Sequence, residues 1–201
     1  MQAVIRHYEL LIDEENDPVR DPEPLRAHMD LWDGEPFLDA LALDGGQDVL
    51  EIGIGTGRLA IRTASLCRHL TGIDLSPKTI ARAGENLSAC PDVTLLCGDF
   101  MTHDFPQSFD VIYSSLTFMH IADKRGAAER IAALLAPGGR AVISLDKDRS
   151  DVIDYGTRQI AVCPDTPEAL EAHLRAAGLT VQARIERPFA WIVTATRKEV
   201  T

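Results

Sequence analysis

The fold is decided by the stretch Val49-Leu50-Glu51-Ile52-Gly53-Ile54-Gly55-Thr56-Gly57-Arg58-Leu59-Ala60. It begins as a short apolar strand with an acid, Glu51, near its end, passes through three alternating glycines and then becomes helical. Glycines suit such a turn because the backbone must bend sharply and let a ligand approach without a Cβ in the way. A carboxylate beside the turn repels a pyrophosphate but attracts a cation or accepts hydrogen bonds. The stretch therefore predicts a nucleoside site for a ligand that is not a dinucleotide.

The length and composition are typical of one globular domain that is long enough to form a hydrophobic core. The chain has 201 residues, of which 45% are hydrophobic and 25% charged, with a formal net charge of −11. This acidic balance argues against a nucleic acid as partner, because binding to a phosphate backbone needs a basic surface. No apolar run approaches the length of a membrane span, and the four cysteines are scattered without metal-type pairing. We expect a cytoplasmic protein with reduced cysteines, no membrane partner and no metal.

Strand-like and helix-like segments alternate along the rest of the chain, which predicts a doubly wound α/β fold with helices on both faces of a parallel sheet. The last two strand-like runs are joined by Glu186-Arg187-Pro188, a link too short for a parallel crossover, so they must be antiparallel neighbours. The expected strands are 48–52, 69–74, 93–97, 109–114, 140–145, 179–185 and 189–196, and the expected helices are 57–67, 77–87, 123–136 and 166–178.

The N-terminal 47 residues stand apart from this pattern. They contain a solvated acidic stretch, several prolines and two short helical faces, but no separate core. We therefore expect a single domain over residues 1–201, in which 1–47 form a helical lid and 48–201 form the ligand-binding core.

Candidate ligand-binding residues lie where the predicted parallel strands end, because ligands of open α/β sheets bind outside those carboxyl ends. Asp74, after the second strand, can accept hydrogen bonds from both ribose hydroxyls. After the third strand, Asp99 can accept from an exocyclic amine and Phe100 can lie on a purine face. Simpler readings exist, since Asp74 followed by Ser76-Pro77 also suits helix capping and Asp99 also suits a turn.

Taken together, these residues resemble the class I S-adenosylmethionine-dependent methyltransferases, in order, across residues 49–197. The first motif of that family is similar to Glu51-x-Gly53-x-Gly55-x-Gly57. Further similar motifs are Asp74, Gly98-Asp99-Phe100, Phe109-Asp110-Val111-Ile112 and Leu135-Ala136-Pro137-Gly138-Gly139-Arg140. The stretch 116–121, together with Asp17-Pro18 and Trp32-Asp33-Gly34, resembles a subgroup that acts on small molecules.

The resemblance implies a Rossmann-like sheet of seven strands in the order 3-2-1-4-5-7-6, with strand 7 antiparallel. It implies that the chain binds S-adenosyl-L-methionine and releases S-adenosyl-L-homocysteine. The glycines would accommodate the methionine part, Asp74 the ribose, and Asp99 with Phe100 the adenine. The residues assigned to the cofactor are Glu51, Gly53, Gly55, Gly57, Asp74, Leu75, Asp99, Phe100 and Ser114.

Methyl transfer needs little covalent help, because a sulfonium methyl is already activated and the protein mainly aligns the nucleophile. His120 is the candidate base, since it follows the fourth strand, although it can equally pack or bond locally. Tyr8, Trp32 and Phe118 are candidates for the acceptor pocket, but Tyr8 and Trp32 also suit the core of the lid.

Two alternatives stay open. An NAD(P)-dependent oxidoreductase also uses a glycine-rich turn, but its third glycine would stand at Arg58. A non-catalytic S-adenosylmethionine-binding protein would carry the same binding residues. The favoured hypothesis is a methyltransferase that acts on an O or N nucleophile of a small molecule, as a monomer or a homodimer.

Overall fold

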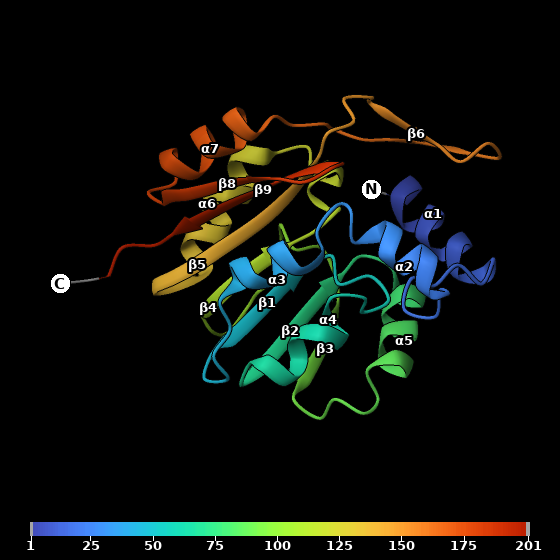
Figure 1. Cartoon of the computed structure of the whole chain (residues 1–201), viewed down its shortest axis with the longest axis horizontal. Coiled ribbons are helices and arrows are strands. Elements are labelled where there is room, and N and C mark those ends of the chain that lie inside the picture. The colour runs from blue at the N-terminus through green and yellow to red at the C-terminus, as the bar shows by residue number, and fades with distance from the viewer. Residues whose placement is uncertain (1, 200–201) are drawn as a thin grey trace.

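The computed structural model describes residues 2–199 and has one central sheet of seven strands (Figure 1). The strand order is β3-β2-β1-β4-β5-β9-β8. Neighbours from β3 to β5 are parallel, whereas β9 is antiparallel to both β5 and β8. This arrangement confirms the predicted order 3-2-1-4-5-7-6. The labels differ because β6 and β7 form a separate hairpin, so that β8 and β9 are the sixth and seventh strands of the main sheet. The strands are β1 (Asp48–Ile52), β2 (His69–Asp74), β3 (Val93–Cys97), β4 (Phe109–Ser114), β5 (Leu135–Asp146), β8 (Thr180–Glu186) and β9 (Ala190–Thr196).

Helices cover both faces of the sheet, as the alternating pattern predicts. The buried hydrophobic side chains form two clusters, one on each face of the sheet. On one face α6 (Lys124–Leu134) and α7 (Pro167–Ala176) bury Ile131 and Leu174 in the first core cluster. On the other face α4 (Ala60–Thr63) and α5 (Pro77–Asn86) contribute Ala60 and Ala83 to the second cluster. The helix starts follow from capping: the side chains of Ser76, Asp123 and Thr166 accept backbone N–H bonds at 3.1, 2.8 and 3.0 Å.

Two element boundaries differ from the prediction. The helix expected over 57–67 is only Ala60–Thr63, continued by a 3₁₀ turn, η1 (Ala64–Leu66). Strand β5 starts at Leu135 instead of 140, because Leu135 already pairs with Phe109 before a register shift. Residues 137–139 lie within that shift and do not separate helix from strand.

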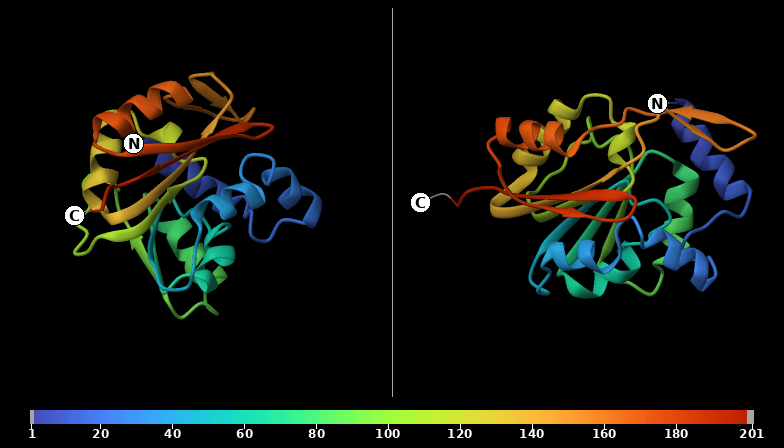
Figure 2. Two further views of the ribbon diagram at one scale, coloured as in Figure 1. Left: turned by 60° about the vertical axis from the view of Figure 1, so that its left-hand side comes forward. Right: turned by 45° about the horizontal axis from the view of Figure 1, so that its top comes forward.

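A hairpin that was not predicted follows β5. Its strands, β6 (Val152–Asp154) and β7 (Gln159–Ala161), pair only with each other in an antiparallel ribbon. The ribbon projects from the main body and lies beside the N-terminal helix, as two views show (Figures 1 and 2).

The N-terminal segment forms three helices with different neighbours. Helix α1 (Gln2–Asp13) packs on α5 and α2 (Glu23–Met29) follows it, whereas α3 (Gly34–Leu41) buries Phe37 and Leu41 in the second core cluster. Asp17, buried between α1 and α2, accepts a hydrogen bond from Asn86 at 3.0 Å. The segment is therefore tied to the core at both ends.

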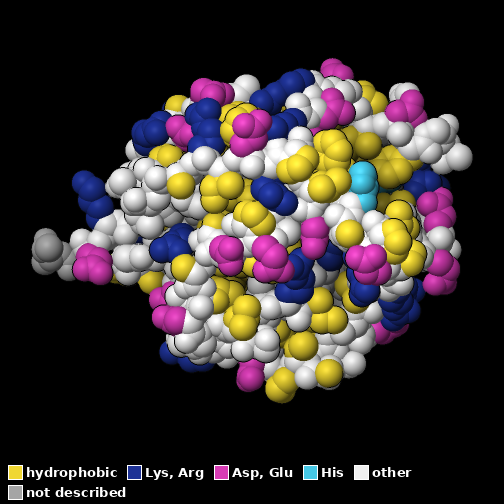
Figure 3. Space-filling model, in the orientation of Figure 1, with side chains coloured by type: hydrophobic (Ala, Val, Ile, Leu, Met, Phe, Trp, Pro, Cys, Tyr) yellow, Lys and Arg dark blue, Asp and Glu magenta, His cyan; other side chains and the backbone are white. Residues whose placement is uncertain are grey.

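Acidic and basic side chains are interspersed over the face drawn in Figure 3. Within residues 2–199, no helix combines the length and the apolar character that crossing a membrane requires.

Candidate active site

A cavity of roughly 670 Å³ lies at the carboxyl ends of β1 to β5, beneath α1 and the β6–β7 hairpin. Its size is that of a small-molecule site. Every one of these five strands contributes a residue at or just after its end: Gly53, Asp74, Asp99, Ser115 and Asp146. The cavity therefore occupies the position that the fold class predicts for a ligand.

The glycine turn forms the floor of this cavity. Gly53 has a φ of +73°, and a Cβ there would lie 2.1 Å from the Thr117 Oγ1 atom. Gly55 has a φ of +57°, but a Cβ there would meet no atom within 4 Å, because this residue faces open space. Gly53 is thus required for packing, whereas Gly55 leaves room for a ligand against the backbone.

Asp74 holds this turn in shape. Its Oδ2 accepts the Gly55 N–H at 3.1 Å, and its Oδ1 accepts the Ser76 N–H at 3.0 Å. Burial raises the pKa of Asp74, and the backbone hydrogen bonds oppose that shift. Asp74 and Leu75 both line the cavity, so one acid serves the turn, the start of α5 and the cavity wall.

Glu51 is a buried acid on the same wall. The Tyr113 hydroxyl donates to its Oε2 at 2.7 Å and lies 2.9 Å from the Thr63 Oγ1. Burial raises the pKa of Glu51 to about 8, although the Tyr113 hydrogen bond and the Arg58 charge favour the ionised form. A cation brought into the cavity would therefore favour the ionised form of Glu51.

Asp99 and Phe100 line the far side of the cavity, after β3. Asp99 Oδ1 accepts the Met101 N–H at 2.9 Å, which shapes the turn. Phe100 is almost fully buried, and its ring packs near Phe105 with the centroids 6.4 Å apart. These residues add one carboxyl group and one aromatic ring to the lining of the cavity.

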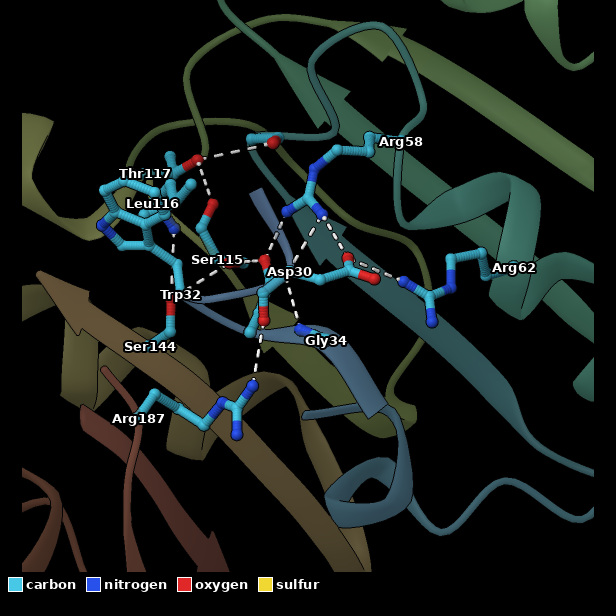
Figure 4. A network of polar contacts seen from close by, with 12 residues as sticks. Asp30, Trp32, Gly34, Arg58, Arg62, Ser115, Leu116, Thr117, Ser144 and Arg187 are labelled. Atoms are coloured by element: carbon cyan, nitrogen blue, oxygen red, sulfur yellow. Dashed lines mark hydrogen bonds and ion pairs between the residues drawn. The ribbon is translucent and has the colours of Figure 1, made fainter. Parts of the chain in front are cut away.

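A polar network links the N-terminal segment to the core (Figure 4). Asp33 is fully buried and accepts hydrogen bonds from the Gly34 N–H at 2.6 Å and the Ser115 hydroxyl at 2.7 Å. It also forms an ion pair with Arg58, whose guanidinium lies 3.5 Å from Asp30. Arg58 lines the cavity, yet its charge is already matched by these two carboxylates.

Tyr8 from α1 meets His120, which follows β4, at the wall of the cavity. The Tyr8 hydroxyl and the His120 Nε2 are 2.7 Å apart, and the two rings meet edge to face. Burial lowers the pKa of His120 to about 4, with the His7 and Lys124 charges adding to the shift, and burial raises the pKa of Tyr8. The imidazole is therefore neutral at physiological pH and chemically able to accept a proton.

The structure separates some predicted site residues from the cavity. The Ser114 hydroxyl is buried and lies 3.2 Å from the Ile52 carbonyl, whereas Gly57 faces Leu87. Phe118 is 1% exposed and belongs to the first core cluster. Gly57, Ser114 and Phe118 are therefore not among the residues that line the cavity, and their assignment to the cofactor or the acceptor stays a prediction. The other predicted residues line the cavity: Tyr8, Trp32, Glu51, Gly53, Gly55, Asp74, Leu75, Asp99, Phe100 and His120.

Several cavity residues were not predicted from the sequence. Arg58 was considered only as a departure from a glycine pattern, and its partner Asp33 only as part of a motif. Ile153 and Tyr155 come from the hairpin, whose strands went unrecognised. A usable signal was present, because Tyr155-Gly156 stands between two short apolar pairs in the manner of a turn.

Comparisons with known proteins agree with this geometry. The family model described as "Methyltransferase domain" matches residues 49–139. An uncharacterized methyltransferase of Mycobacterium tuberculosis is 35% identical over 106 residues, which are 52% of this chain and 53% of that protein. The chain thus spans about half the length of such curated relatives. The 27-O-demethylrifamycin SV methyltransferase of Amycolatopsis mediterranei is 31% identical over 179 residues, or 79% of this chain and 65% of that protein.

The fold as a whole also has solved counterparts. The crystal structure of the [4+2]-cyclase SpnF superposes with a TM-score of 0.79 at 19% identity and covers 98% of this chain and 96% of that one. At this identity the match concerns the fold alone. The sequence matches, the strand order and the glycine turn at the cavity lead to one conclusion: the chain belongs to the class I S-adenosylmethionine-dependent methyltransferase family.

Proposed function

We propose that this chain transfers the methyl group of S-adenosylmethionine to an oxygen or nitrogen atom of a small molecule by in-line displacement. The observation that carries the proposal is the open space in front of Gly55, on a cavity wall rich in carboxyl groups. Around the glycine turn these groups belong to Glu51, Asp74 and Asp99, and the guanidinium of Arg58, the one that lines the cavity among residues 2–199, is paired with Asp33 and Asp30. Such a wall favours a cationic sulfonium ligand over a pyrophosphate.

The residues fit the parts of this cofactor in turn. Gly53 and Gly55 would accommodate its methionine part, with Glu51 nearby to accept from the amino group. Asp74 and Leu75 would hold the ribose, and Asp99 with Phe100 the adenine. When bound, the cofactor supplies an activated methyl group, so that the protein is left with alignment and proton transfer.

The chain's own contribution to the reaction would come from Tyr8 and His120. His120 is the proposed base, since its imidazole is neutral and its Nε2 lies within hydrogen-bond reach of a hydroxyl. Tyr8 occupies that nitrogen in this structure, so an acceptor would either displace the Tyr8 hydroxyl or pass its proton along it. Tyr8 and Trp32 would contact the acceptor, and α1 with the hairpin would exclude water.

The proposal of a small-molecule acceptor gains support from the Amycolatopsis relative, whose name specifies 27-O-demethylrifamycin SV as its substrate. One structural counterpart is a [4+2]-cyclase, SpnF, and a shared fold does not by itself determine the reaction. Binding and transfer therefore need separate measurements.

Binding is tested by calorimetric titration of the purified chain with S-adenosylhomocysteine, S-adenosylmethionine and NADPH. We expect saturable heat with the first two only. Asp74→Ala should weaken binding at least about tenfold, because two hydrogen bonds to an ionised acceptor contribute roughly 1.5–3 kcal/mol. The exposed Asp92→Ala serves as the matched control. Saturation with NADPH alone would reject the cofactor assignment.

Transfer is tested with methyl-tritiated S-adenosylmethionine and a panel of small-molecule alcohols, phenols and amines. Label in an extracted product supports the proposed reaction. Tight cofactor binding without transfer to any panel member would favour the non-catalytic alternative.

A further inference from the structure

We infer that the methyl acceptor is an uncharged, largely apolar molecule and carries neither a phosphate nor an ammonium group. This inference rests on the proposed function, since it names the class of molecule that the same cavity accepts. It depends on the part of the cavity bounded by α1, the β6–β7 hairpin and the segment after β4, which we call the acceptor chamber.

The walls of the acceptor chamber are mainly hydrocarbon. They include Val4, Ile5 and Ile12 from α1, Met119 and Ile121 after β4, and Ile153 from the hairpin. Removing apolar surface from water contributes about 25 cal/mol per Å². A chamber with such walls thus gains affinity from hydrocarbon or ring surface and loses it wherever a charged group must shed its water.

An anionic acceptor finds no free cation there. Arg58 is the one Lys or Arg side chain that lines the cavity among residues 2–199, and the carboxylates of Asp33 and Asp30 hold it. His120 is neutral at physiological pH, because burial lowers its pKa to about 4. A phosphate or carboxylate would therefore enter this mainly hydrocarbon chamber without a counter-charge.

A cationic acceptor would meet in the same region two carboxylates, those of Asp146 and Asp123, that already accept hydrogen bonds from the protein. Asp146 Oδ2 accepts from the Trp32 Nε1 at 2.9 Å, and its Oδ1 accepts from the Asp148 N–H at 2.7 Å. Asp123 Oδ1 caps α6 through the Gly126 N–H at 2.8 Å. The polar group best placed to orient an acceptor is the uncharged Tyr8–His120 pair, which suits a hydroxyl.

The test uses matched probes on the full chain saturated with S-adenosylhomocysteine. Three ring systems, naphthalene, biphenyl and anthracene, are each prepared as a neutral diol, as its phosphate monoester and as its aminomethyl phenol. Each probe keeps one free hydroxyl on the same ring system, so the members of a set differ in the charge of the second substituent. Affinities are measured by calorimetry.

We expect at least one neutral diol to bind at least about tenfold more tightly than both of its charged analogues. Ile153→Asp should weaken that binding by a similar factor and leave the dissociation constant of S-adenosylhomocysteine unchanged. The exposed Leu25→Asp on α2 controls for an added charge outside the cavity.

A charged probe that binds as tightly as its neutral partner would overturn the inference. It would also be overturned if no neutral diol bound to protein that still binds S-adenosylhomocysteine. Failure of S-adenosylhomocysteine itself to bind would instead reject the proposed function, so the two failures are distinguishable.

Discussion

Gly55 has a left-handed backbone conformation and open space in front of its Cα. Its replacement therefore distinguishes an effect on ligand binding from an effect on folding. Gly55→Val should abolish binding of S-adenosylhomocysteine and cost stability only through backbone strain, about 1–3 kcal/mol. Gly45→Val is the matched control, because Gly45 also has a positive φ (+85°) and open surroundings but lies before β1. The affinity of both variants for S-adenosylhomocysteine is measured by calorimetry, and their stability is measured by thermal unfolding. Normal binding by Gly55→Val would mean that no ligand approaches this backbone.

Glu51 predicts how stability depends on pH. Its pKa of about 8 in the folded chain lies above the ordinary value of 4.5, so the folded state holds the proton more tightly than the unfolded state. The resulting stabilisation is complete below about pH 4.5 and is lost as the pH rises through about 8. Glu51→Gln mimics the neutral acid, and we expect the melting temperature of the wild type to fall relative to this variant between pH 5 and 9.

The measurement for Glu51 is a series of thermal melts without ligand. The exposed Glu23→Gln is the control, and its difference from the wild type should stay constant over the same range. Parallel profiles for the wild type and Glu51→Gln would show that this acid is ionised in the folded protein throughout.

His120 is tested by comparison with its hydrogen-bond partner. If His120 is the base, His120→Ala should slow transfer by about 10²-fold or more with little change in the affinity for S-adenosylhomocysteine. Tyr8→Phe keeps the imidazole and removes only the hydroxyl, so it should have the smaller effect. Because burial lowers the pKa of His120 to about 4, the wild-type rate should be level above about pH 5 and fall below it. Weakened cofactor binding at an unchanged rate would instead assign His120 a structural role.

Helix α1 and the β6–β7 hairpin form the roof of the cavity, and Arg158 joins them. Arg158, on the hairpin, contacts Glu14 at 2.6 and 2.7 Å and His7 Nδ1 at 3.0 Å. Arg158→Ala should change the melting temperature little, because the ion pair is partly exposed and screened by solvent. It should nevertheless accelerate hydrogen exchange in residues 2–13. Arg125→Ala, which removes an exposed ion pair with Glu129 on α6, is the control, and equal exchange in both variants would contradict this view of the roof.

The elements differ in how far the sequence predicts them. Helix α5 is marked by Ser76-Pro77 and α7 by Thr166-Pro167, and in both cases the expected cap bond is present. Hairpin strands of three residues each carry too little periodicity to stand out from a loop. The early start of β5 was also missed, since Pro137-Gly138-Gly139 looks like a break until Leu135 is seen to pair with Phe109.

For the molecule as a whole, local chemistry was predictable and long-range contacts were not. The glycine turn and Asp74 lie at strand ends that the alternating pattern identifies, so their arrival at one cavity follows from topology. The strand order itself came from the family resemblance. Tyr8 and His120 are 112 residues apart, and no periodicity places a helix of the N-terminal segment over the end of β4. The distinction between Phe118 in the core and His120 in the cavity likewise depends on a single 3₁₀ turn, η2 (Phe118–His120).

The buried carboxylate of Asp33 limits which part of the chain can move when the cavity opens. Asp33 anchors the start of α3 to Arg58 and Ser115 in the interior. Movement of Asp33 away from this position would leave the Arg58 guanidinium without its ion-pair partner in a poorly hydrated environment. The chain after Asp33 therefore acts as a fixed pivot. We expect any gate that admits an acceptor to hinge ahead of it, within the first thirty or so residues, while the floor of the pocket stays still.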